Sequence, residues 1–178
     1  MCTANTGESI VGFVWIIALS LLSWRDSLYG AMIYIIGDSV AAVLTNEFQI
    51  SRMIGMMLLG GTIYAIEIPH YFAWIDRYLD NKGYWNRIKR ALLAEAFFNP
   101  LWIARHIALI KCFSGQYADL QWNLLSIGWT SFIQIAPFAI VINYFIQNLI
   151  PLAWRFMASA VFSALMAVYY ALSEVLFV

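Results

Sequence analysis

The segment from Arg52 to Asp80 combines membrane-spanning length with two ionisable residues in its interior. Its sequence is RMIGMMLLGGTIYAIEIPHYFAWIDRYLD, and crossing the hydrocarbon core of a bilayer takes about 20 mostly apolar residues. Glu67 and His70 lie at roughly mid-depth, where an ionisable group costs on the order of 3 kcal/mol. Because such groups normally face a protein interior or a wet cavity, the segment predicts a polar interior enclosed by an integral membrane protein.

The composition agrees with this prediction. Of the 178 residues, 63% are hydrophobic and 11% are charged, whereas a soluble domain is about 45–50% apolar and about 25% charged. The ten basic and ten acidic residues cancel, so no overall field attracts nucleic acid. We predict an all-α fold: a polytopic integral membrane helix bundle, one domain over residues 1–178, with about four to six hydrophobic helices in contact with membrane lipid.

Apolar runs separated by short polar junctions predict where the helices lie. The expected ranges are Ser9–Trp24, Ser27–Thr45, Met53–Leu79, Arg87–Phe113, Leu120–Gln147 and Pro151–Glu174. No Lys or Arg precedes the first range, so we expect a retained helix rather than a cleaved signal. Half of the basic residues crowd one connection, which by the positive-inside tendency faces the cytoplasm or a mitochondrial matrix; they are Arg77, Lys82, Arg87, Lys89 and Arg90.

Polar residues within these helices fall on shared faces. In a continuous helix over 87–113, Glu95, Asn99 and His106 lie within about 40° of one another. One interpretation is that the polar groups join helices, each contact adding roughly 1 kcal/mol. The sharper interpretation is that they line or gate a hydrated cavity or pore, with the histidines and Arg155 as partners of the acids. The candidate lining or gating residues are Asp38, Glu67, His70, Glu95, Asn99, His106, Asn143 and Arg155.

Glu67 and His70 also match a Glu-x-x-His metal motif, which needs a second copy and two further carboxylates in known di-iron sites. The other histidine, His106, has Ile103 where the second Glu should be. We therefore expect no metal site and no cofactor, and no set of catalytic residues is visible.

Small residues predict close helix packing. Ala160, Ala164, Ala167 and Ala171 form one stripe, and Gly37-x-x-x-Ala41 and Gly61-x-x-x-Ala65 form small-xxx-small pairs. In lipid, small residues let helix backbones approach and gain dispersion contacts. The expected result is a compact bundle, and a homo-oligomer is compatible with it.

The order of several short motifs is similar to that of a known family. The motifs are Gly37-Asp38, Arg52, Gly60, His70-Tyr71-Phe72, Ile75-Asp76, Arg90, Ala94-Glu95, Pro100, Ala136-Pro137, Asn143-Tyr144, Ile150-Pro151, Arg155 and Tyr169–Ser173. In this order and spacing they resemble the mitochondrial inner-membrane and peroxisomal membrane proteins typified by Mpv-seventeen and the twenty-two-kilodalton peroxisomal membrane protein. The chain departs from the family pattern at Ala42, Ala65-Ile66 and Ala94, as a distant member would.

The resemblance implies an organellar integral membrane protein, in the mitochondrial inner membrane or the peroxisome, for which pore or channel activity has been proposed in several relatives. A bacterial chain would instead lie in the plasma membrane. The embedded acids independently favour a pore or transporter for small polar solutes or ions. The alternatives are a scaffolding membrane protein whose polar groups only pair helices and, ranked last, an intramembrane enzyme using Glu67 and His70.

Overall fold

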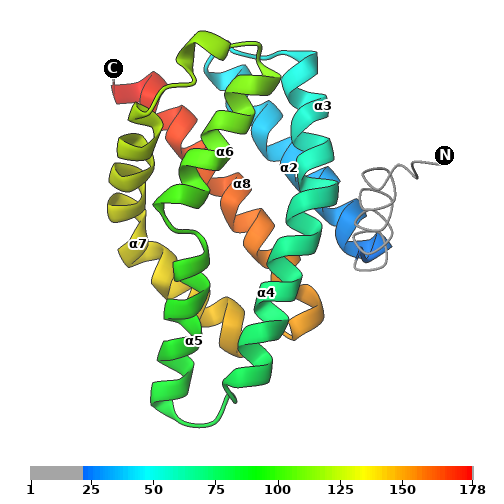
Figure 1. Cartoon of the computed structure of the whole chain (residues 1–178), viewed down its shortest axis with the longest axis vertical. Coiled ribbons are helices and arrows are strands. Elements are labelled where there is room, and N and C mark those ends of the chain that lie inside the picture. The colour runs from blue at the N-terminus through cyan, green and yellow to red at the C-terminus, as the bar shows by residue number, and fades with distance from the viewer. Residues whose placement is uncertain (1–21, 178) are drawn as a thin grey trace, which may run out of the picture.

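The computed structural model describes residues 22–177, in which helices and short turns alternate without any strand (Figure 1). The all-α prediction is therefore confirmed, while the helix expected at Ser9–Trp24 lies almost wholly outside the described residues. The helices are α2 (Trp24–Leu44), α3 (Ile50–Leu59), α4 (Ala65–Tyr78), α5 (Tyr84–Phe97), α6 (Pro100–Phe113), α7 (Asn123–Leu149) and α8 (Leu152–Phe177). A π-helical segment, Gly60–Tyr64, joins α3 to α4, and a short 3-10 helix, Tyr117–Asp119, precedes α7.

Within residues 22–177, four helical segments are long and apolar enough to cross a bilayer, so the chain is an integral membrane protein. These segments are Trp24–Leu44, Ile50–Tyr78, Asn123–Leu149 and Leu152–Tyr169. Because Ile50–Tyr78 runs the length of the bundle, its two ends define opposite ends of the molecule (Figure 1). We call the end with the α2–α3 turn (residues 45–49) the turn end, and the end with the α4–α5 loop (residues 79–83) the loop end.

The single helix expected over Arg87–Phe113 is wrong, because α5 and α6 are separate helices that follow one another along the bundle (Figure 1). The break has a local cause. The Oδ1 atom of Asn99 accepts hydrogen bonds from the backbone N–H groups of Leu101, at 3.0 Å, and Trp102, at 3.1 Å. Pro100 occupies the first turn of α6, where its missing N–H costs nothing. Asn99 therefore starts a new helix in the middle of an apolar segment.

Close approach of α2 to its neighbours holds the bundle together, as the small-residue pattern predicts. A Cβ atom added to Gly37 would lie 2.5 Å from the Cβ of Ala164 on α8. One added to Gly60 would lie 2.6 Å from the carbonyl oxygen of Gly30 on α2. No side chain larger than hydrogen fits either contact without moving a helix.

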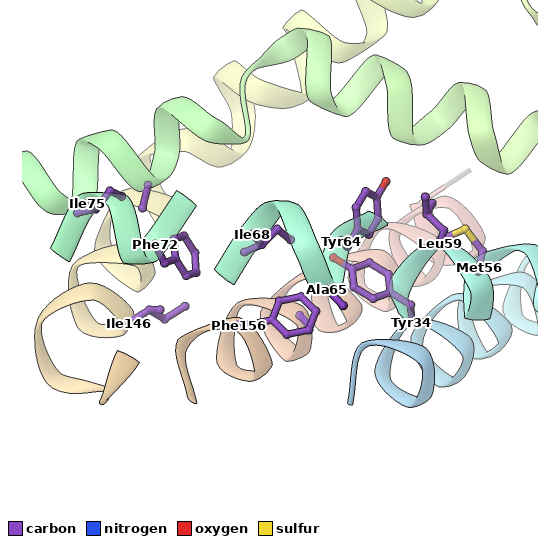
Figure 2. Packing of buried hydrophobic residues seen from close by; sticks show 12 residues of the cluster. Tyr34, Met56, Leu59, Tyr64, Ala65, Ile68, Phe72, Ile75, Ile146 and Phe156 are labelled. Atoms are coloured by element: carbon purple, nitrogen blue, oxygen red, sulfur yellow. The ribbon is translucent and has the colours of Figure 1, made fainter. Parts of the chain in front are cut away.

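The buried hydrophobic cluster follows α3 and α4 and receives side chains from α2, α7 and α8 (Figure 2). Tyr64, Ile68, Phe72 and Ile75 are fully buried along this line. The hydroxyl of Tyr64 points away from the cluster toward α6 (Figure 2). The apolar core thus occupies one side of the Ile50–Tyr78 span. The hydroxyl of Tyr64, at the edge of this core, makes a polar contact with His106 on α6.

Candidate polar cavity

A cavity of about 480 Å³ lies in the turn-end half of the bundle, lined mainly by α2, α6, α7 and α8. Its wall includes Glu47, whose side chain is 55% exposed, so the cavity reaches the molecular surface at the turn end. Ser131, Ser159 and Ser163 add hydroxyl groups, and isoleucine, phenylalanine and tryptophan side chains make up much of the rest. Its ionisable and amide lining residues are Asp38, Glu47, Arg52, Glu95, His106 and Asn143.

Asp38 and Arg52 form the ion pair nearest the turn end. The guanidinium of Arg52 donates from Nε to Asp38 Oδ2 at 2.9 Å and from Nη2 to Oδ1 at 2.7 Å. A third contact, at 3.4 Å, reaches Glu47. This two-point geometry fixes both side chains more firmly than a single contact would. The sequence prediction that a histidine or Arg155 would pair with Asp38 is therefore wrong.

Glu95 and Asn143 form a buried polar part of the cavity wall. Glu95 is 5% exposed, and its Oε2 accepts a hydrogen bond of 2.9 Å from the Nδ2 atom of Asn143. Among the described residues, no cation pairs with this carboxylate. It differs in this respect from Asp38, whose charge Arg52 balances.

His106 is held against aromatic neighbours rather than beside an acid. Its Nδ1 lies 2.8 Å from the hydroxyl oxygen of Tyr64. The ring stacks on Trp102, with centroids 5.5 Å apart, and Trp102 in turn meets the ring of Phe98 edge to face at 5.0 Å. These three rings form one wall of the cavity along α6 and the α5–α6 break.

A second buried group of charges lies at the loop end, outside the cavity. Asp76 of α4 accepts hydrogen bonds from Arg90 of α5 and from Nη1 of Arg155 on α8, the latter at 2.7 Å. Arg90 also donates to the backbone oxygen of Gln147 on α7 at 2.9 Å, and Arg155 to that of Ile150 at 2.8 Å. We call Asp76, Arg90 and Arg155 the loop-end cluster. It ties four helices together, and it places Arg155 away from the cavity that it was predicted to line.

Glu67 and His70 do not face the cavity, in contrast to the sequence prediction. Glu67 forms two hydrogen bonds with Arg105 of α6, of 2.9 and 2.6 Å, and both side chains are partly exposed. His70 is exposed, with its Nδ1 2.7 Å from the backbone oxygen of Ile66. The apolar residues Ala65, Ile68, Phe72 and Ile75 form the buried face of α4, and Glu67 and His70 lie off that face.

Half of the predicted lining residues therefore meet in the cavity, namely Asp38, Glu95, His106 and Asn143. Glu67 and His70 lie outside, Asn99 caps α6, and Arg155 belongs to the loop-end cluster. The sequence analysis missed the roles of Arg52 and Tyr64, since it named Arg52 only among the family-like motifs and did not single out Tyr64. Nothing in their local spacing indicates the partners on α2 and α6.

Within the described residues, no three His, Cys, Asp or Glu side chains gather as metal ligands. Comparisons of the chain with protein-family models, with curated proteins and with solved structures find no match.

Proposed function

We propose that the protein is a transporter or pore for small polar solutes or ions, and that the cavity holds the solute. The observation that supports this most strongly is the position of Glu95 and Asn143. They lie buried on the wall of a cavity that reaches the surface at Glu47, and Asn143 belongs to the membrane-length helix α7. Buried polar groups of this kind are costly in a membrane bundle and usually mark a solute or ion path.

A line of polar groups continues from the cavity toward the loop end. Gln147 lies one helical turn beyond Asn143 on α7, is 0% exposed, and its side-chain amide has no hydrogen-bond partner among the described residues. Its backbone oxygen accepts from Arg90. On α5, Arg90 lies five residues before Glu95, which corresponds to about 7.5 Å of helix. In this proposal the loop-end cluster closes the far end of the path.

We also propose that the chain is a distant member of the Mpv-seventeen family and lies in an organellar membrane. The charged residues of the family-like motifs support the membership. Asp38 and Arg52 pair with each other, and Asp76, Arg90 and Arg155 form the loop-end cluster. Motifs distant in sequence thus meet in space as two ionic clusters. Fluorescent fusions of the chain, imaged beside mitochondrial and peroxisomal markers, test the localisation, and a uniform cell-surface signal would contradict it.

The transport proposal predicts solute flux that depends on the cavity. In proteoliposomes we expect the purified protein to release small polar solutes, and Glu95→Gln to change the rate or selectivity at least tenfold. Glu67→Gln is the matched control, because it makes the same chemical change outside the cavity, and it should leave flux within twofold of wild type. Folded protein without flux would contradict the proposal, and would instead favour the scaffolding function.

A further inference from the structure

We propose that the cavity binds a small organic cation, with the positive group at Glu95 and the apolar body against Phe98 and Trp102. The inference rests on the proposed function, because it names the class of solute that the same cavity would take. It depends on the charge balance of the cavity, on the position of Glu95 in its helix, and on the character of the wall beside it.

The charges lining the cavity do not balance. Three carboxylates, those of Asp38, Glu47 and Glu95, share one guanidinium, that of Arg52. Arg52 contacts the first two of these acids, and the imidazole of His106 is occupied by Tyr64 and Trp102. Glu95 receives one hydrogen bond from a neutral amide, and no charged side chain in the described part of the chain pairs with it. Without a cation, a buried carboxylate in this situation takes up a proton and becomes neutral. A bound organic cation would instead supply the missing partner and keep Glu95 ionised.

The last turn of α5 places partial negative charge at Glu95, while α6, which begins five residues later at Pro100, starts with the opposite partial charge. Glu95 lies in the last turn of α5, which ends at Phe97, and the C-terminal carbonyl groups of a helix carry a partial negative charge. Such a position disfavours an acid and favours a cation. Because α5 stops inside the bundle instead of continuing into α6, the end of the helix lies beside the cavity rather than at the membrane surface.

The surroundings favour an organic cation over a bare metal ion. Phe98 follows Glu95 by three residues, and its ring, Trp102 and His106 form a continuous aromatic wall. Aromatic faces attract ammonium groups, tryptophan most strongly, but they supply none of the six or more oxygen ligands that a hard metal ion needs. A volume of about 480 Å³ is also within the range of small-molecule sites.

Binding to the full-length purified protein in detergent tests the inference without requiring transport. The probes are benzylammonium, benzyl alcohol and benzoate, which share a ring and differ in charge. We expect titration calorimetry to show benzylammonium binding at least tenfold more tightly than the other two. Glu95→Gln should abolish this preference, Glu95→Asp should retain part of it, and Asp119→Asn, an exposed acid outside the cavity, should not change it.

Equal affinity for the three probes, or an unchanged preference in a Glu95→Gln protein that melts as wild type does, would overturn the inference. If Glu95→Gln does not fold, the inference is still tested by whether the wild-type protein prefers benzylammonium and whether Glu95→Asp retains part of that preference. Ammonium binding without flux would contradict the transport proposal alone. Flux of a neutral solute without ammonium binding would contradict this inference alone.

Discussion

Four acids within the bundle have different environments, and their partners explain why. Asp38 is paired by Arg52, Asp76 lies between two arginines, and Glu95 has a single amide. The same residue type therefore serves as a fixed ion pair, as a tie between helices, or as an unbalanced charge on a cavity wall. The fourth acid, Glu67, forms a partly exposed pair with Arg105.

Asp76→Asn tests the loop-end cluster. The substitution leaves Arg90 and Arg155 buried without a carboxylate. Breaking a buried ion pair destabilises the folded protein by at least about 3 kcal/mol. We expect this lower value because the Asp76 side chain is itself 34% exposed. Chemical unfolding of the purified protein in micelles measures the loss. Asp119→Asn, which removes the exposed pair with Lys111, should cost about 0.5 kcal/mol. Equal losses in the two variants would contradict a stabilising role for the cluster.

Periodicity was sufficient to predict most of the helices, because long apolar runs leave few alternatives in a membrane. The sequence does carry a signal for the break, a capping residue followed by proline at Asn99-Pro100. The prediction read the mainly apolar stretch 91–113 as one helix and overlooked that signal. The π-helical segment has no comparable local signal beyond Gly60-Gly61. Glu67 and His70 were predicted to face inward because they are ionisable, but apolar residues fill the buried face of α4. Asp38 and Asn143 were placed correctly, on α2 and α7.

The contact between α2 and α8 provides a prediction about helix packing. Gly37→Ala places a methyl group against Ala164, and overpacking of this kind costs about 1–3 kcal/mol. In an Ala164→Gly background the same substitution should cost less, because the 2.5 Å contact with the Cβ is removed and only the 2.9 Å contact with the Cα of residue 164 remains. Unfolding of the four proteins of this double-mutant cycle gives the coupling energy. The same cost for Gly37→Ala in both backgrounds would contradict close packing at this site.

At the scale of the whole molecule, the two ends of the bundle differ. The turn end contains the cavity and reaches the surface at Glu47, while the loop end is held by the cluster of Asp76, Arg90 and Arg155. The predicted basic loop lies at the second end, so the cavity opens toward the opposite side of the membrane. For a solute to pass from the cavity to the loop end, α4, α5 and α8 would have to separate at the loop-end cluster.

The central claim is that the cavity is accessible from the turn end alone, and side-specific cysteine labelling tests it most directly. In a background with Cys2→Ser and Cys112→Ser, Ser163→Cys lies on the cavity wall, Gln147→Cys lies beyond it, and exposed Lys82→Cys marks the loop end. With a membrane-impermeant thiol reagent, we expect Ser163→Cys to react only from the side opposite Lys82→Cys, and Gln147→Cys from neither side. Reaction of Ser163→Cys from the Lys82 side, or from neither side, would contradict the account.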